Sequence, residues 1–136
     1  MKTKPYLSLD DARSIASAAE AEAKRNDWAV TIAVVDDGGH LLWLQRLDGA
    51  APVSSYIGPE KARTAALGRR ETKTYEDMIN GGRYAFLTAP RIEALLEGGV
   101  PIVVDGHVVG AVGVSGVKSS EDVQIAKAGI AALGLG

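Results

Sequence analysis

The sequence predicts an α+β fold in which helices flank an antiparallel β-sheet. Segments with helical spacing of apolar residues alternate with short β-branched runs. Two turns, Asp37-Gly38-Gly39 and Asp105-Gly106, each lie between β-rich runs, as in hairpins. Strands joined by such short turns pair antiparallel. The predicted order is α-β-β-α-α-α-β-β-α, and residues 1–136 are expected to form a single domain.

The first half of the chain is predicted to form a helix, a hairpin and a second helix. Ser8, followed three residues later by Asp11, resembles a capping box at the start of the first helix. This helix is expected to end near residues 25–27. Strands are expected at 28–35 and 40–47, and residues 52–70 return to helical spacing.

The second half is predicted to form two short helices, a second hairpin and a final helix. The short helices are expected at 72–79 and 89–96, on either side of the Asn80-Gly81-Gly82 break. The strands are expected at 100–104 and 107–114, because both runs are β-branched. Ser119 or Ser120 is expected to cap the last helix.

Small residues dominate the composition. The chain has 21 alanines and 16 glycines in 136 residues, and aromatic residues make up only 5%. Small side chains allow close packing but bury little apolar area each. We therefore expect a homo-oligomer, in which an interface between subunits completes the burial.

The composition excludes several functional classes. The chain has no cysteine, which rules out disulfides, iron–sulfur clusters and thiolate ligands. The charges are balanced, with 15 Lys and Arg against 17 Asp and Glu, so nucleic acid is not an expected partner. No phosphate-binding loop or dinucleotide fingerprint occurs, and no nucleotide cofactor is expected. Metal-ligand spacings of histidine are also absent, so no metal site is predicted.

The chain shows no targeting or membrane segment. Acidic residues follow the N-terminal lysines where a signal peptide would be apolar. No apolar run approaches the length of a membrane span. A cytoplasmic protein without membrane contact is therefore expected.

Five stretches of the chain resemble the GlcG/HbpS-like family, which includes the C-terminal domain of PduO-type proteins. They are VVDDGGHLL at 34–42, RLDGA at 46–50, KARTA at 61–65, GGVPI at 98–102 and GAVGVSG at 110–116. The resemblance covers about residues 8–133. It implies a profilin-like antiparallel sheet flanked by helices, assembled into a symmetric oligomer. It also implies haem or another tetrapyrrole as a possible ligand, and an accessory role in a catabolic pathway.

Three residues are candidates for catalysis: His40, Asp48 and Glu97. His40 begins a strand after a glycine turn and is suited to be an axial haem ligand or a general base. A histidine that lies on the surface or only packs the turn is the alternative. The other histidine, His107, is expected to be a solvated hairpin residue. Further axial candidates are Met78 and the tyrosines.

A basic clamp for an anionic ligand is predicted around one strand-to-helix connection. Arg46 and Lys61 offer a bidentate guanidinium and a point charge for a carboxylate or a propionate. Asp48 and Ser54 lie between them in the sequence. A surface salt-bridge cluster is the alternative.

The glycine-rich segments are predicted to approach a ligand or a neighbouring backbone closely. Their members are Gly98, Gly99, Gly113, Ser115 and Gly116. Exposed backbone N–H groups there would form an anion-binding nest. Close packing of strand against helix is the alternative.

Three functions remain open from the sequence, one of which is a scaffolding subunit without a ligand, in keeping with the small-residue composition. The other two involve a small molecule. One is a small-molecule-binding protein for haem, another tetrapyrrole or an anionic metabolite. The other is a cofactor-independent isomerase, tautomerase or dehydratase that acts on a small carboxylated metabolite and uses the same clamp.

Overall fold

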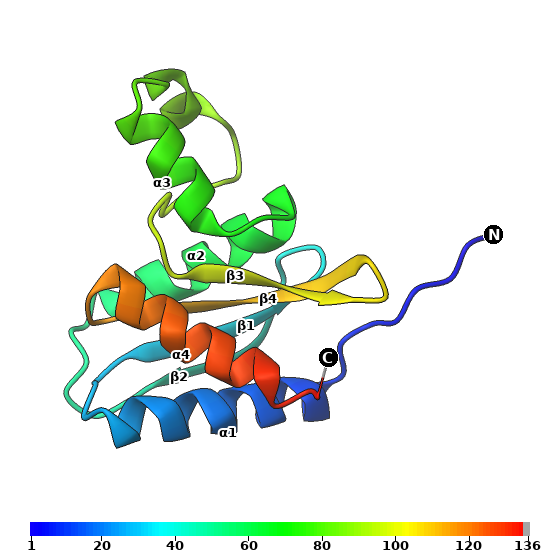
Figure 1. Cartoon of the computed structure of the whole chain (residues 1–136), viewed down its shortest axis with the longest axis vertical. Coiled ribbons are helices and arrows are strands. Elements are labelled where there is room, and N and C mark those ends of the chain that lie inside the picture. Colours follow the sequence, from blue (N-terminus) through cyan, green and yellow to red (C-terminus); the bar gives the residue numbers. More distant parts are fainter. Residues whose placement is uncertain (135–136) are drawn as a thin grey trace.

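The computed structural model describes residues 1–134 and shows a four-stranded antiparallel sheet with helices on both faces (Figure 1). The strands are β1 (Thr31–Asp36), β2 (Leu41–Arg46), β3 (Gly99–Val104) and β4 (His107–Ser115). Their order across the sheet is β2-β1-β4-β3. Both predicted hairpins form, and β1 pairs with β4 to join them into one sheet.

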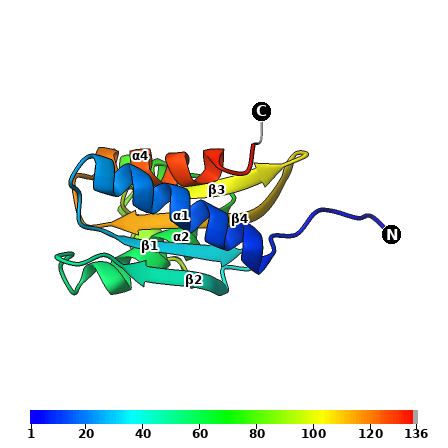
Figure 2. The same cartoon turned by 90° about the horizontal axis from the view of Figure 1, so that it is seen from below.

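The helices form unequal layers. α1 (Leu9–Arg25) and α4 (Ser119–Ala131) cover one face, and α2 (Ser54–Gly68) covers the other (Figure 2). α3 (Thr72–Asn80) and the 3-10 helix η1 (Tyr84–Thr88) project away from the sheet (Figure 1). We call residues 72–98 the arm. Within residues 1–134, none of the helices has the length and apolar character needed to span a bilayer.

The predicted α+β fold class and the predicted order of elements are confirmed. The helix expected at 89–96 is wrong in position. The helix that follows α3 is the 3-10 helix η1, which ends at Thr88, just before the expected segment. Arg91 (φ 68°) and Ala94 (φ 48°) have left-handed backbone, which a helix over 89–96 cannot include. Pro90 also disfavours helical backbone at the residue before it. Ala89 is accordingly extended, with φ −64° and ψ 135°.

The two long helices begin in different ways. In α1 the predicted capping box is present, because Ser8 Oγ accepts from the Asp11 N–H at 3.0 Å and Asp11 Oδ2 accepts from the Ser8 N–H at 2.9 Å. In α4 the predicted serine caps are wrong. The cap position is Lys118, whose backbone N–H donates to Glu121 Oε1 at 3.2 Å.

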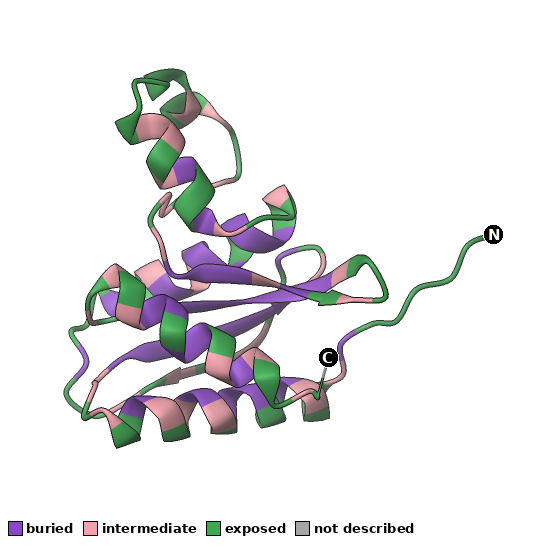
Figure 3. Cartoon of the chain, viewed as in Figure 1, coloured by how far each residue is buried: buried purple, intermediate pink, exposed green. Residues whose placement is uncertain are grey.

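The small residues serve packing between elements. Figure 3 shows buried positions along the strands and on α1 and α4. Four alanines of α1 lie fully buried against the sheet and α4: Ala12, Ala16, Ala19 and Ala23. Gly129 of α4 lies so close to α1 that a Cβ there would sit 2.8 Å from the Ile15 carbonyl oxygen. Part of the alanine and glycine content is thus explained by close contacts inside this chain.

Candidate functional site

Lys61 lies inside the protein and not on a binding surface. It is on the side of α2 that faces the sheet, and its side chain is 3% exposed. Its Nζ donates to the Val114 carbonyl oxygen at 3.0 Å and to Asp122 Oδ2 at 3.1 Å. Lys61 therefore joins α2, β4 and α4, and its charge is already matched by a carboxylate.

The buried Asp122 completes this pair from the first turn of α4. Its Oδ1 accepts from the Val117 N–H at 3.2 Å. Burial raises the pKa of this carboxyl to about 6, and the neighbouring Lys61 ammonium opposes the rise. The ion pair is thus held in a place that is costly for a charged carboxylate.

The glycines next to this pair allow α2 to lie directly on β3 and β4. A Cβ at Gly113 would sit 2.1 Å from the Gly58 carbonyl oxygen, and one at Gly99 would sit 2.3 Å from the Lys61 carbonyl oxygen. At Gly98 a Cβ would come within 2.6 Å of Lys61 Nζ. The close approach predicted for these glycines is therefore an approach of helix to strand.

The predicted anion-binding nest is not formed at Gly98 and Gly99, since both are buried. The Gly99 N–H already donates to Thr72 Oγ1 at 2.8 Å. Gly116, with φ 145°, faces the segment after α1, where a Cβ would sit 2.6 Å from the Ala29 carbonyl oxygen. The Gly99 N–H thus joins β3 to α3, and Gly116 allows the end of β4 to pack against the segment after α1.

The two predicted serines are also buried. Ser54 Oγ lies 2.7 Å from Thr31 Oγ1 and donates to the Ala51 carbonyl oxygen at 2.6 Å. Ser115 ends β4 opposite Thr31 and is 7% exposed. Both positions tie the sheet to its connections, with little surface left for a ligand.

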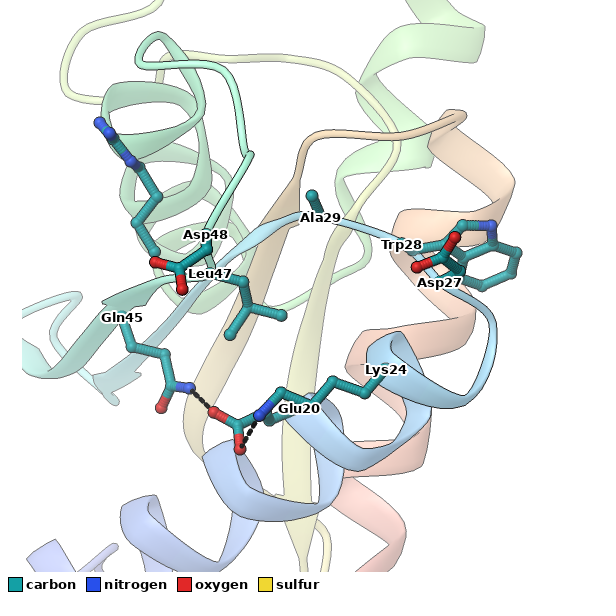
Figure 4. A pocket seen from close by; sticks show the side chains of 9 residues that line it. Glu20, Lys24, Asp27, Trp28, Ala29, Gln45, Leu47 and Asp48 are labelled. Atoms are coloured by element: carbon teal, nitrogen blue, oxygen red, sulfur yellow. Dashed lines mark hydrogen bonds and ion pairs between the residues drawn. The ribbon is translucent and has the colours of Figure 1, made fainter.

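Arg46 and Asp48 line one open groove of about 420 Å³ between α1 and the end of β2 (Figure 4). In the view of Figure 4, Asp48 lies across the groove from Asp27 and Trp28. The Glu20 carboxylate in this groove is already engaged by Lys24 at 3.3 Å and by Gln45. Lys61 is not part of this lining, so the structure does not bring the two predicted clamp residues together.

Glu97 lies half-buried at the end of the arm, just before β3. It does not line the groove of Arg46 or the hollow around His40 described below. His107 is exposed as the first residue of β4, which matches its expected place in the hairpin.

His40 presents an exposed imidazole that is fixed from one side. Its Nδ1 lies 3.1 Å and 3.2 Å from the two carboxylate oxygens of Asp36, while the side chain is 81% exposed. Asp36 Oδ1 also accepts from the N–H groups of Gly38 and His40, each at 2.9 Å. With Nδ1 engaged by a carboxylate, Nε2 is the nitrogen left for a ligand. Metal-binding histidines are commonly oriented in this way.

His40 lies at the edge of a hollow of about 630 Å³ between the β1–β2 turn, α2 and the arm. We call it the His40 hollow. Its walls are mainly apolar, and one arginine of α2 and one of the arm also line it. The lining residues are Val35, Gly38, Gly39, His40, Leu41, Pro59, Arg63, Leu67 and Arg91.

Sequence reasoning identified only His40 of this hollow as a site residue. Arg63 entered only as a member of the KARTA stretch at 61–65, and nothing near Arg91 in the sequence marked it. The reason is that Arg91 follows Pro90 in an irregular segment 51 positions after His40 in the chain. Only the return of the arm toward the sheet brings the two together.

Comparisons with known proteins agree with this architecture. Residues 7–131 match the family model described as haem degrading protein HbpS-like. Protein GlcG of Escherichia coli strain K12 is 63% identical over 115 residues, which is 85% of this chain and 85% of that protein.

Two solved structures share the fold. A double mutant of HbpS from Streptomyces reticuli is 31% identical, with a TM-score of 0.87 over 98% of this chain and 90% of that one. The structure of a PduOC:haem complex is 29% identical, with a TM-score of 0.85 over 97% of this chain and 98% of that one.

Proposed function

Because this chain belongs to the HbpS-like family, we propose that it is a small-molecule-binding protein that holds haem or a related anionic tetrapyrrole in the His40 hollow. The observation that carries the proposal is the carboxylate-oriented imidazole of His40 at the edge of a mainly apolar hollow that two arginines also line. One structural relative is a haem complex, which supports the ligand class.

The residues of the hollow fit the chemistry of haem. To hold haem, a protein needs a residue that can bind the iron, apolar walls for the ring and cations for the propionates. His40 Nε2 would bind the iron. Val35, Leu41 and Leu67 would contact the ring, and arginine side chains would bind the propionates. When bound, haem supplies the redox chemistry of its iron.

Asp36 is the positioning residue in this proposal. Its carboxylate accepts from Nδ1 of His40, which fixes the ring orientation and increases the basicity of Nε2. The same carboxylate holds the β1–β2 turn through two backbone N–H groups. Orientation of the ring and shape of the turn therefore depend on one side chain.

A haemin titration tests the proposal. Wild-type protein is expected to give a saturable, sharpened Soret band, and His40→Ala is expected to lose the axial-ligand signature. Asp36→Asn keeps an acceptor for the turn and should bind about 10- to 100-fold more weakly, as is typical when the partner of a metal-bound histidine is changed. His107→Ala is the matched control, since it removes the other histidine. No saturable band, or a His40→Ala spectrum identical to wild type, would contradict the proposal.

A second candidate is the cofactor-independent enzyme acting on a small carboxylated metabolite. It is favoured by the open groove that Arg46 and Asp48 both line. Arg46 would bind the carboxylate and Asp48 would act as the base. Arg46→Ala would then abolish turnover without any change in haem binding, whereas unchanged turnover would remove the groove from the mechanism.

A homo-oligomer remains part of the proposal. The arm projects from the sheet and exposes large apolar side chains, among them Tyr84, Leu87 and Leu96. Burial of these side chains against another copy would be favourable. Light scattering coupled to size exclusion tests the mass, and a monomer at micromolar concentration would contradict this part. The accessory role in a catabolic pathway rests on the family resemblance.

A further inference from the structure

Arg91 enters the His40 hollow from a segment of the arm that is held in place. Thr64 Oγ1 on α2 donates to the Glu93 carbonyl oxygen at 2.6 Å and accepts from the Glu93 N–H at 3.0 Å. Thr64 is fully buried, so this double contact fixes the returning segment against α2. Arg91 is thereby set beside Arg63 and Leu67, which line the same hollow.

The backbone at Arg91 is in a conformation that arginine rarely adopts. Its φ is 68°, in the left-handed region, and Ala94 in the same segment has φ 48°. Such conformations persist only where the surrounding contacts enforce them, and they are frequent in segments that hold ligands. Here the contact of Thr64 with Glu93 supplies part of that enforcement.

The charges around the hollow are paired except for Arg91. His40 contacts the Asp36 carboxylate, and Arg63 lies 3.4 Å from Glu60 Oε1. Within residues 1–134, no hydrogen bond or ion pair joins the Arg91 guanidinium to another residue. Arg91 is therefore the cation in this hollow whose charge remains available to a ligand.

We propose that Arg91 is the specificity-determining residue of the hollow, which selects tetrapyrroles with free carboxylate side chains over neutral ones. The inference rests on the proposed function and narrows its ligand class. A guanidinium binds a carboxylate through two parallel hydrogen bonds, and the negative charge of the carboxylate strengthens both. An ester is neutral and therefore binds a guanidinium more weakly. Arg63 contributes less to this selection because Glu60 already neutralises it.

The test compares haemin with its dimethyl ester, which has the same ring and iron but no carboxylate. Wild-type protein is expected to bind haemin about tenfold or more tightly than the ester, the scale of a charge-assisted hydrogen bond. Arg91→Gln should reduce this ratio to about one through weaker haemin binding. Arg91→Lys should keep part of the ratio.

The matched control is Arg83→Gln, on the same arm but outside the hollow, where the guanidinium lies 4.9 Å from the Phe86 ring centroid. It should keep the wild-type ratio. A wild-type ratio near one, or an Arg91→Gln ratio equal to wild type, overturns this inference and leaves haem binding through His40 standing. If neither haemin nor its dimethyl ester binds, both proposals are overturned.

Discussion

Two cations lie on opposite sides of α2 and differ in their surroundings. On the side toward the sheet, the Lys61 ammonium is 3% exposed and is paired with Asp122. Beside the outer surface of α2, Arg91 is exposed at the His40 hollow and has no ion-pair partner within residues 1–134. A buried cation must be matched inside the protein, whereas an exposed one remains available. The difference separates a residue that holds the fold from one suited to bind a ligand, and each prediction below tests it.

The largest expected effect comes from removal of the buried cation. Lys61→Met leaves the Asp122 carboxylate buried without its partner, and unfolding in urea at pH 8 should show a loss of about 3–5 kcal/mol. Lys73→Met is the control, because Lys73 pairs with Asp77 on the surface, and it should change stability little.

The double variant Lys61→Met with Asp122→Asn separates charge from packing. The asparagine is neutral and still accepts from the Val117 N–H. It should therefore recover most of the stability lost in Lys61→Met at pH 8. If the double variant were as unstable as the single one, lost packing and not the unmatched carboxylate would be the cause.

The next effect tests how closely α2 approaches the sheet. Gly113→Ala would place a methyl group 2.1 Å from the Gly58 carbonyl oxygen, so α2 must shift outward. The free energy of unfolding should fall by roughly 1–3 kcal/mol, as is typical of overpacking. Gly58 and Pro59 lie side by side on α2, and Pro59 lines the hollow, so haemin affinity should also fall. An alanine variant with wild-type stability would contradict this packing.

A smaller effect is expected from release of the arm. Thr64→Val removes both hydrogen bonds to the Glu93 backbone and should cost about 1–2 kcal/mol. It should also weaken the preference for haemin over its ester, because Arg91 loses its support. Thr64→Ser retains the hydroxyl and should preserve that preference. Equal ligand ratios in Thr64→Val and wild type would show that Arg91 is positioned without this contact.

A change of pH perturbs the buried pair without removing any atom. The pKa of Asp122 is raised in the folded protein to about 6, from 3.8 for an ordinary aspartate. The folded state therefore binds more protons than the unfolded state between these values, and the contribution of Asp122 to stability falls as the pH rises from about 4 to 6. The stability of wild type minus that of Asp122→Asn should show this decline, and a difference independent of pH would contradict it.

Local structure could be predicted from the sequence alone. Helical spacing, β-branched runs and two glycine turns were sufficient for the order of elements and for both hairpins, because these signals lie between near neighbours in the chain. The capping box at Ser8 spans only three residues and was predicted for the same reason. The position of the third helix was missed because Arg91 and Ala94 adopt left-handed backbone, which the helical spacing of the sequence does not reveal.

Which residues come together in a site depends on long-range packing. Lys61 meets Asp122 across 61 positions, and Thr64 meets Glu93 across 29. Neither pair has a local signal, since its members come together only when α2, α4 and the arm pack around the sheet. Burial therefore assigned Lys61 to the interior, although the sequence had placed it in a ligand clamp. The same packing brought Arg91 to His40, because the direction in which the arm returns depends on contacts that no short segment contains.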